Sequence, residues 1–510
     1  MEYKWKKLQN GSDIRGIALK GIEGEEVNLT PEVINILGKA FIQWLQKSER
    51  NQPVTVSVGT DSRISGPSLK EAFISGMREA GAKVFDCGMA STPAMFMTTV
   101  SGENPADAGV MLTASHLPFN RNGLKFFTDK GGLNKEDISD ILKIAEQGSF
   151  QPVDNSNSLE RIQFIDNYAE FLVKYIRKNA GIESQYEEPL NGLKIIVDAG
   201  NGAGGFFTAK VLQPLGANTQ GSQFLDPDGK FPNHVPNPED PKAMQYICDA
   251  VIREKADMGI IFDTDVDRAA VVDAEGNPIN RNSLIALISA IILKEHPGST
   301  IVTDSITSEG LTRFIEKDLK GKHHRFKRGY KNVINEAIRL NNSGEESWLA
   351  IETSGHAAFK ENYFLDDGAY LVAKLLVEMA KLHQEGKTLP GLISSLKQPV
   401  ESAEIRFPIV EEDFQSYGSG VITELEEKVK EKEGWEIDSP NFEGLRVRCI
   451  NPAEKGWFLL RLSLHDPVMP LNIESEVEGG VEKIKETLAG MFVIFDCLDL
   501  TPFNFNQNQS

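Results

Sequence analysis

The strongest constraint on this fold is an alternation of short apolar runs with segments whose apolar residues repeat at helical spacing. Residues 54–58 alternate as in a strand, and residues 67–80 have the spacing of a helix that ends at Gly81. The unit continues with a strand at 82–85, a helix that begins near Ser91 and a strand at 108–112. This β-α-β-α-β order favours a mostly parallel sheet.

The same alternation recurs twice further along the chain. The second unit has a strand at 193–197, a glycine-rich turn at 200–205, a helix at 206–215 and a strand at 258–262. The third has strands at 299–303, 324–327 and 348–351 and helices at 308–319 and 330–340. A recurring supersecondary unit of similar size predicts three related α/β domains.

From about residue 396 the pattern changes. We expect a charged helix at 411–432, strands at 445–449 and 457–462, and a final helix at 473–488, which together predict a smaller C-terminal α+β domain. The predicted domains therefore span residues 1–157, 158–273, 274–395 and 396–510.

Charge and cysteine usage exclude several classes of partner. The net charge of -20 opposes binding to nucleic acid or to an anionic membrane, and no apolar run is long enough to span a bilayer. The four cysteines are widely separated, which predicts reduced thiols rather than disulfides or a zinc site. We expect a cytoplasmic protein without a secretory signal, or one of an organellar stroma if a transit peptide has been removed.

An acidic loop, Asp263-Thr264-Asp265-Val266-Asp267-Arg268, stands between two apolar strand-like runs. Three carboxylates at a spacing of two can converge on one hard cation. A calcium-binding EF-hand is the competing interpretation, but Arg268 stands where that loop needs glycine and Ala274 where it needs glutamate. A solvated turn remains the alternative; the position at strand ends favours a magnesium site.

Ser115 and His116 follow the apolar run at 108–112, and a loop of Pro, Asn, Arg and Gly leads on to Lys125. A Ser-His pair alone most often marks a turn, and a hydrolase would need a GxSxG elbow, which is absent. Beside a metal and Lys125, the serine oxygen could instead carry a phosphoryl group, whose charge both cations would offset.

Three further segments are weak signals when taken alone. The turn at 200–205 formally matches a dinucleotide motif but lacks the acidic residue about 20 positions on, so we interpret it as a strand-to-helix turn. Glu352 and Ser354 follow a strand and suit sugar hydroxyls, whereas Arg461 and Ser463 share a strand face and suit a phosphate.

Together these segments resemble the α-D-phosphohexomutase superfamily, in particular its phosphomannomutase/phosphoglucomutase group. The serine loop at 113–118, the segment at 122–125, the acidic loop and the segment at 352–356 match family motifs in family order. Further matches are Asp13-Ile14-Arg15-Gly16, Gly59-Thr60-Asp61-Ser62-Arg63, Asp228-Gly229-Lys230-Phe231-Pro232 and Lys327-Arg328-Gly329-Tyr330, in the last of which Tyr330 replaces the usual histidine.

The resemblance implies a four-domain fold around a central cleft, with three related α/β domains that have mixed sheets and a smaller α+β domain. It implies an isomerase that interconverts hexose 1-phosphate and hexose 6-phosphate, of glucose or mannose, through a phosphoserine enzyme and a hexose 1,6-bisphosphate. Mg²⁺ would be held by Asp263, Asp265, Asp267 and the phosphorylated Ser115.

The implied catalytic residues are Ser115, His116, Lys125, Arg15, Arg268 and Lys327. The implied substrate-binding residues are Glu352, Ser354, His356, Arg461, Ser463 and His465. The implied partners are small hexose phosphates, and we expect a monomer or a dimer.

The sequence departs from this family at two places. Leu117 replaces the asparagine that usually follows the Ser-His pair, and Leu464 and His465 replace groups that would donate hydrogen bonds to a phosphate. Candidates to compensate for the second loss are His465, Arg446 and Arg448. Two alternatives to a glucose or mannose phosphate mutase therefore stay open: a phosphoglucosamine or acetylglucosamine-phosphate mutase, and a catalytically weakened protein that binds sugar phosphates.

Overall fold

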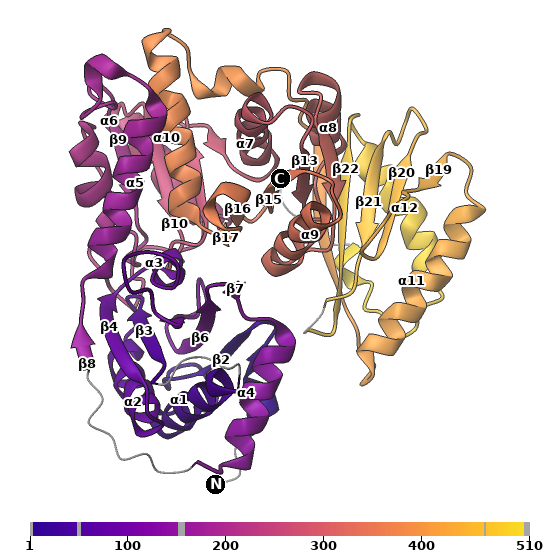
Figure 1. The fold of residues 1–510 in the computed structure, drawn as a ribbon. Helices are drawn as coiled ribbons and strands as arrows, with labels where there is room; N and C mark the ends of the chain where they lie inside the picture. The colour runs from indigo at the N-terminus through magenta and orange to yellow at the C-terminus, as the bar shows by residue number, and fades with distance from the viewer. Residues whose placement is uncertain (1–3, 48–52, 151–158, 464–465, 504–510) are drawn as a thin grey trace. The chain divides into compact units, whose positions relative to one another are not determined.

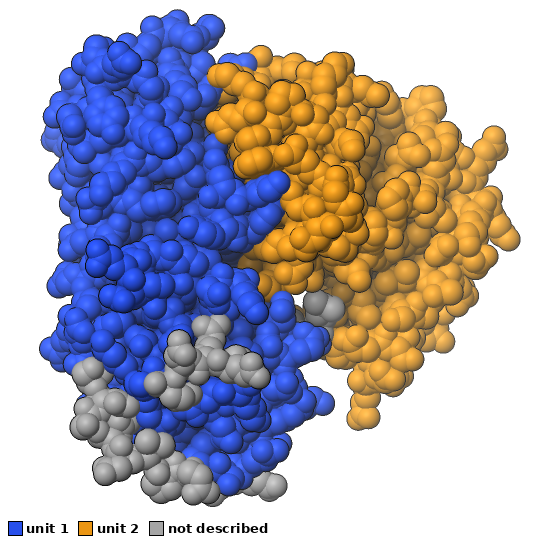
Figure 2. Space-filling view, in the orientation of Figure 1, with its two compact units in different colours: residues 1–284, 354–391 blue, residues 285–353, 392–510 orange. Residues whose placement is uncertain are grey.

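The computed structural model describes residues 4–47, 53–150, 159–463 and 466–503 (Figure 1). These residues form two compact units (Figure 2). Unit 1 contains residues 1–284 and 354–391, and unit 2 contains residues 285–353 and 392–510. Among the described residues, no helix is both long enough and apolar enough to cross a membrane.

The first sheet of unit 1 is mixed and has the strand order β1-β2-β6-β5-β3-β4-β8, with β7 paired to β6. Its strands are β1 (Gln9–Asn10), β2 (Asp13–Ile17), β3 (Thr55–Thr60), β4 (Lys83–Met89), β5 (Ala108–Leu112), β6 (Arg121–Thr128), β7 (Gly131–Gly132) and β8 (Leu159–Arg161). Strands β3, β4, β5 and β8 are parallel, as the β-α-β pattern predicts, and β6 runs antiparallel to β5.

Helices cover both faces of this sheet. Helices α1 (Pro31–Gln46), α2 (Gly66–Glu79) and α4 (Lys135–Gln147) share one core with it, in which Phe41 and Phe73 pack against Phe126 of β6. On the other face, α3 (Thr92–Met97) packs Phe96 against Phe127. Neighbouring strand residues point to opposite faces of a sheet, so Phe126 packs against the helices on one face and Phe127 against α3 on the other.

The second sheet of unit 1 has the order β12-β11-β10-β9. Strand β9 (Ile195–Asp198) runs parallel to β10 (Met258–Phe262), whereas β10, β11 (Ala269–Val272) and β12 (Pro278–Ile279) are antiparallel. The unit also contains α5 (Phe164–Ala180), α6 (Pro241–Glu254), the hairpin β16 (Ala357–Phe359) and β17 (Leu365–Asp366), and α10 (Gly368–Gln384). The helix predicted at 206–215 is present as a π-helical turn at Thr208–Leu212, followed by a 3₁₀ turn at Gln213–Leu215.

Unit 2 begins within α7 (Arg281–Glu295) and holds the parallel strands β14 (Lys322–Arg325), β13 (Thr300–Thr303) and β15 (Ser347–Ile351). Their helices are α8 (Glu309–Arg313), which continues through a wide turn at Phe314–Asp318, and α9 (Tyr330–Asn342).

The C-terminal sheet of unit 2 is antiparallel, in the order β18-β22-β21-β20-β19. Its strands are β18 (Glu401–Pro408), β19 (Trp435–Ile437), β20 (Leu445–Cys449), β21 (Gly456–Leu460) and β22 (Val468–Ser475). Helices α11 (Phe414–Lys430) and α12 (Gly480–Phe492) share one core with it, to which Leu425, Phe458 and Ile484 belong. The predicted fold class, three α/β domains with mixed sheets and a smaller C-terminal domain, is confirmed, whereas the three predicted domain boundaries stay predictions.

Two sequence predictions about secondary structure are wrong. The final helix does not begin at Ile473, because Val468–Ser475 is strand β22 and α12 begins only at Gly480. In β22 the fully buried apolar residues Met469, Leu471 and Ile473 stand at every second position, which is the period of a strand.

The loop that follows Ser115 is also shorter than predicted. Strand β6 begins at Arg121, so Lys125 lies in a strand and not at the end of a loop. Gly123 allows this pairing. A Cβ atom there would lie 2.3 Å from the carbonyl oxygen of Ile14, so only glycine lets β6 lie this close to β2.

Candidate active site

The serine loop begins where β5 ends and is held by one buried guanidinium. Arg63 donates hydrogen bonds to the carbonyl oxygens of Leu117 (2.6 Å), Pro118 (2.7 Å) and Arg121 (3.0 Å), and also to that of Ser115. Asp61 lies within ion-pair distance of Arg63, at 3.3 Å. The Gly59–Arg63 motif therefore shapes the loop from inside, and at position 117 the contact uses the backbone rather than the side chain.

Two short contacts hold Ser115 itself. The hydroxyl of Thr113 accepts from the Ser115 N–H at 2.9 Å and donates to Asp61 at 2.7 Å. Ser115 has φ +51°, in the left-handed region that non-glycine residues rarely adopt. Such a conformation persists only where its surroundings enforce it, and it is concentrated at functional sites.

The hydroxyl of Ser115 points into a cluster of charged groups. Its Oγ donates to Oδ2 of Asp263 at 2.9 Å and accepts from Nη2 of Arg268 at 3.0 Å. The same Nη2 atom lies 2.6 Å from Nδ1 of His116. Burial, followed by the charge of Arg268, lowers the pKa of His116 to about 2, so the imidazole is neutral and accepts from Arg268.

The acidic loop joins β10 to β11 in a tight hairpin, with Val266 at φ +66°. Oxygen atoms of the buried carboxylates Asp263, Asp265 and Asp267 all lie within 4.8 Å of one another. The glycine-rich turn at 200–205 supports this loop, because a Cβ at Gly202 would lie 2.6 Å from the Thr264 carbonyl oxygen. That turn is a strand-to-helix connection, as expected, and its glycine is required by close packing.

Lys125 supplies the positive charge that this cluster needs. Its Nζ lies 2.9 Å from Oδ2 of Asp265 and also contacts Asp267. Burial alone would raise the pKa of Asp267, but the charges of Lys125 and His356 hold it below its usual range. Burial and the neighbouring Asp267 and Asp265 raise the pKa of Asp263, the carboxylate that faces Ser115.

The residues fit a divalent cation. The Oδ1 atoms of Asp265 and Asp267 are buried and have no hydrogen-bond partner among the described residues. Unpaired carboxylate oxygens in a buried cluster, with a serine oxygen beside them, form the all-oxygen donor set that hard cations select.

His356 extends the cluster rather than joining the donor set. Its Nδ1 lies 2.6 Å from Asp366 and 3.9 Å from Asp267. Burial opposes its charge, but Asp366 and Asp267 outweigh this and raise the pKa of His356 to about 9. A protonated imidazole offers no lone pair to a metal.

The other predicted residues are divided between the two units. In unit 1, Arg15 on β2 pairs with Asp13 at 2.9 Å, and its charge helps to lower the pKa of His116, while Ser354 is buried beyond the strand end. In unit 2, Glu352 accepts from the Gly329 N–H at 2.6 Å, and Lys327 is exposed just after β14. Arg461 is buried and Ser463 half-buried; His465 lies outside the described residues.

Several contacts in the cluster could not be expected from sequence spacing. Thr92, which opens α3, donates its hydroxyl to Oδ2 of Asp265, and its N–H donates to the Asp265 carbonyl at 2.8 Å. Asn237 accepts from Nη1 of Arg268 at 3.2 Å. In the sequence Thr92 has only the signature of a helix start, and Asn237 that of a turn.

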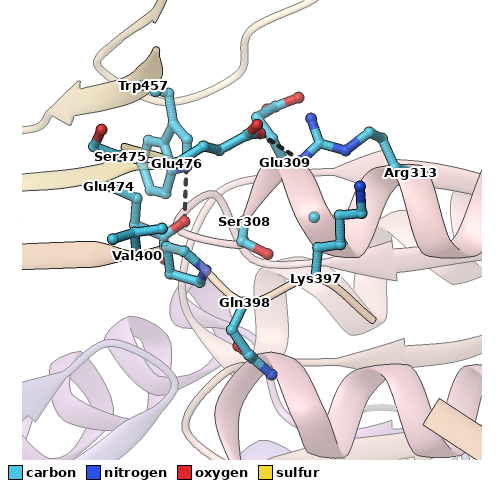
Figure 3. A pocket seen from close by; sticks show the side chains of 13 residues that line it. Ser308, Glu309, Arg313, Lys397, Gln398, Val400, Trp457, Glu474, Ser475 and Glu476 are labelled. Carbon is cyan, nitrogen blue, oxygen red and sulfur yellow. Dashed lines mark hydrogen bonds and ion pairs between the residues drawn. The ribbon is translucent and has the colours of Figure 1, made fainter. Parts of the chain in front are cut away.

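Unit 2 contains a separate cavity of about 350 Å³ (Figure 3). The indole N–H of Trp457 donates to Glu474 at 2.8 Å on one side of it, and Arg313 pairs with Glu476 on the other. Burial raises the pKa of Glu474 to about 7. None of the site residues predicted from the sequence lines this cavity.

Arg446, expected as a candidate for phosphate binding, is instead committed within unit 2. It donates to the carbonyls of Ser305 (2.9 Å) and Thr307 (3.0 Å), and its guanidinium carbon lies 3.7 Å from the ring centroid of Trp457. Arg448 pairs with Glu436 (3.0 Å) and Asp438 (2.8 Å). Because Arg446 is also buried, that prediction is wrong for it.

Comparison with known proteins finds similarity along most of the chain. Models of phosphoglucomutase/phosphomannomutase α/β/α domains I, II and III match residues 6–152, 166–276 and 280–399. A phosphoglucomutase of Neisseria gonorrhoeae is 30% identical over 93% of this chain and 94% of its own. A phosphomannomutase/phosphoglucomutase of Pseudomonas syringae is 31% identical over 93% and 92%.

A solved structure is similar along almost the whole chain as well. A phosphoglucomutase/phosphomannomutase family protein from Burkholderia thailandensis superposes with a TM-score of 0.77 at 28% identity, over 95% of this chain and 96% of that one.

Proposed function

Because the chain belongs to the phosphoglucomutase/phosphomannomutase family, we propose that it interconverts hexose 1-phosphates and hexose 6-phosphates, with glucose and mannose phosphates as substrates. The observation that carries this proposal is the contact of 2.9 Å between Ser115 Oγ and Asp263, inside a carboxylate cluster that also holds Lys125 and Arg268. A phosphoryl group on this serine would meet cations on several sides.

In the proposed reaction, phosphorylated Ser115 is the donor. The O6 hydroxyl of a hexose 1-phosphate attacks the phosphorus, a P–O6 bond forms, and the P–Oγ bond breaks. The hydroxyl proton is passed through the protein to the serine oxygen. The resulting 1,6-bisphosphate turns over, and Ser115 Oγ attacks the phosphorus of the 1-phosphate. A P–Oγ bond forms, the P–O1 bond breaks, the serine proton is passed to O1, and hexose 6-phosphate leaves. No net phosphate is gained or lost.

The residues of the cluster contribute positioning and charge. Lys125 and Arg268 lie where they can offset the charge of the transferred phosphoryl group, and Arg15 lies near enough to act on His116. The low pKa of His116 makes it a poor proton acceptor in the free protein, so we assign it a hydrogen-bonding role toward the phosphate. Asp263, Asp265 and Asp267 would hold Mg²⁺, which supplies Lewis-acid charge when bound.

The residues of unit 2 are proposed to recognise substrate. Glu352 is buried just after β15 and is proposed to accept a hydrogen bond from a sugar hydroxyl, and Ser354 in unit 1 is proposed to do the same. Lys327 would offset phosphate charge, and Arg461 with Ser463 would bind the phosphate that is not transferred. His356 and His465 stay proposals for substrate contact.

A substrate panel tests this function. The Mg²⁺-loaded protein, with a trace of glucose 1,6-bisphosphate, should convert glucose 1-phosphate or mannose 1-phosphate to the 6-phosphate. Ser115→Ala should lower kcat by at least about a thousandfold and remove the mass of one phosphoryl group from the intact protein. The exposed Ser75→Ala on α2 is the control.

The same panel separates the alternatives. Faster turnover of glucosamine 1-phosphate or N-acetylglucosamine 1-phosphate would assign the chain to amino sugars. Binding of hexose phosphate without any turnover, and without phosphate on Ser115, would identify a weakened binding protein.

We also propose that the chain works in a reducing, cytoplasm-like compartment. Its four cysteines are all unpaired thiols, and Cys87, Cys248 and Cys449 are buried. Growth of cells that carry a fluorescent fusion, followed by fractionation, would test this location.

A further inference from the structure

One motif of the sequence, at residues 228–232, has no role in the proposed function. It opens the segment 228–240, which leads into α6 without a helix or strand of its own. Connecting segments usually run over the surface, yet His234, Pro236 and Pro238 are buried here. A segment without regular structure that buries these side chains is held by specific contacts, and three of them point toward the serine loop and the acidic loop.

The first part of this segment packs against the residues that shape the serine loop. A Cβ atom on Gly229 would lie 2.5 Å from both the backbone nitrogen of Ile64 and the carbonyl oxygen of Ser62, so the two backbones are in direct contact. The ring centroid of Phe231 lies 5.3 Å from the guanidinium carbon of Arg63, within cation–π range. Arg63 is the residue that donates to the carbonyl oxygens of the serine loop.

The last part of the segment contacts the second arginine of the site. Nη1 of Arg268 donates to Oδ1 of Asn237 at 3.2 Å and lies 3.8 Å from Oε2 of Glu239. The same Oδ1 accepts from the backbone N–H of Glu239 at 3.0 Å, which fixes the amide. Because a guanidinium is planar and rigid, a partner on Nη1 also sets the direction of Nη2, which donates to Ser115 at 3.0 Å.

The middle of the segment is fastened by a buried pair. Nε2 of His234 lies 3.0 Å and 3.1 Å from the two carboxylate oxygens of Asp198, and neither side chain is exposed. Both oxygens of Asp198 are acceptors, since one also accepts from the Gly200 N–H and the other from Gln223. Nδ1 of His234 lies 2.8 Å from the Val235 carbonyl oxygen, so both ring nitrogens face acceptors and the imidazole is charged. Burial opposes this charge, but Asp198 outweighs it and raises the pKa of His234 above its usual range.

This pair joins the segment to the sheet that carries the acidic loop. Asp198 ends β9, which runs parallel to β10, the strand that leads directly into Asp263. Gly200 lets the segment come close to this strand end, because a Cβ atom there would lie 2.9 Å from Cβ of Pro236. The contacts with Arg63 and Arg268 therefore lie on either side of one fixed point.

We propose that His234 is a positioning residue, whose pair with Asp198 holds residues 228–240 against the two arginines that contact the serine loop. His234 contacts neither of these arginines itself and acts through the segment. When the pair is lost, the segment loosens, and Arg268 loses the partner that directs it toward Ser115. The expected effect on turnover rests on the proposed function, whereas the expected effect on the order of the serine loop does not.

Two substitutions in the full-length protein test the pair. His234→Ala removes it, whereas in His234→Gln an amide nitrogen can still donate to Asp198. The control is His324→Ala, which removes another histidine–carboxylate pair, with Glu336 at 2.9 Å in unit 2. On glucose 1-phosphate we expect His234→Ala to lower kcat at least about tenfold while KM changes less than about threefold, and His234→Gln to recover kcat to within about threefold of the wild type.

Amide hydrogen exchange measures the order of the serine loop without any turnover. In His234→Ala we expect the backbone N–H groups of residues 113–121 and 228–240 to exchange at least about fivefold faster than in the wild type. In His324→Ala both regions should keep their wild-type rates. Faster exchange at 228–240 alone, with kcat unchanged, would show a merely structural pair and overturn the proposal.

Asn237→Ala tests the step between the segment and Arg268, and it serves as the second variant if His234→Ala does not fold. It leaves the pair with Asp198 in place, so exchange at 228–233 should stay at the wild-type rate. We expect kcat to fall at least about tenfold, because Arg268 loses its partner on Nη1. An unchanged kcat in this variant, in a protein that is an active mutase, would overturn the proposal.

The proposed function and the positioning role fail separately. An active wild type whose kcat is kept in His234→Ala overturns the role of His234 and leaves the function standing. A wild type with no mutase activity overturns the function, and the exchange rates at 113–121 in His234→Ala then decide the positioning role. Faster exchange there supports it, and wild-type rates overturn it.

Discussion

The hydroxyl oxygen of Ser115 lies 2.9 Å from Oδ2 of Asp263, although 148 residues separate them in the chain. Ser115 lies in the loop after β5 of the first sheet of unit 1, and Asp263 directly follows β10 of the second. Arg63 donates to the Ser115 carbonyl, and the contact with Asp263 brings this left-handed serine onto a buried cluster of three carboxylates.

Lys125→Met removes the buried ammonium that pairs with Asp265 and Asp267. The remaining carboxylates then repel one another, and breaking a buried pair costs about 3–5 kcal/mol of the free energy of unfolding. We expect a lower melting temperature in EDTA, and a larger rise on adding MgCl₂ than in the wild type, because a divalent cation replaces the lost charge. Thermal unfolding followed by circular dichroism measures both.

The control is Lys143→Met, which removes an exposed pair with Asp140 on α4 and should change neither value by much. An equal response of Lys125→Met and wild type to MgCl₂ would contradict a cation site at the three aspartates.

Arg63→Lys keeps the charge in the serine loop but loses the planar fork that reaches carbonyls of Ser115, Leu117, Pro118 and Arg121. At least one charge-assisted hydrogen bond is lost, each worth about 1.5–3 kcal/mol. Because the loop positions Ser115, we expect kcat to fall at least about tenfold while KM changes less than about threefold. Steady-state kinetics on glucose 1-phosphate gives both values.

Arg78→Lys on α2 is the matched control, since that arginine contributes none of these contacts to the loop. Equal kcat values for Arg63→Lys and wild type would show that the loop keeps its geometry without the guanidinium.

Leu117→Asn restores the residue usual in the resembling family and should have little effect. Position 117 contributes its backbone carbonyl to Arg63, at 2.6 Å, and any residue provides that atom. We expect kcat/KM to stay within about twofold of the wild type. A gain of tenfold or more would mean that the side chain at this position contacts substrate.

Glu474→Gln should change how stability depends on pH. Burial raises the pKa of Glu474 from 4.5 to about 7, so between these values the folded state holds a proton that the unfolded state has lost. The free energy of unfolding therefore falls as pH rises through this window. In Glu474→Gln the fall in melting temperature between about pH 5 and pH 7.5 should be smaller.

Differential scanning calorimetry at several pH values measures this slope, with the exposed Glu424→Gln on α11 as control. Parallel curves for Glu474→Gln and wild type would show that Glu474 titrates normally.

The sequence by itself determined the local elements and the residue types of the site. The strands Met258–Phe262 and Leu445–Cys449 have the bounds expected for them, because the first is a contiguous apolar run and the second alternates apolar residues with arginines. The chemistry of the serine loop and of the acidic loop was also readable, but only when the two were considered together with Lys125 and the segment at 352–356, because each alone is more typical of a turn.

Only the tertiary structure decided which residues meet. The contacts of Thr92 with Asp265, of Arg63 with the serine loop, and of Arg406 with Pro470 join strands and loops from distant parts of the chain, and no local spacing encodes them. The structure also argues against Arg446 as a phosphate ligand. Its side chain is buried and already donates hydrogen bonds to four acceptors, which the charge of an arginine in a sequence does not reveal. Ser115 was identifiable as a residue, but its left-handed conformation and its distance to Asp263 depend on how the sheets of unit 1 pack.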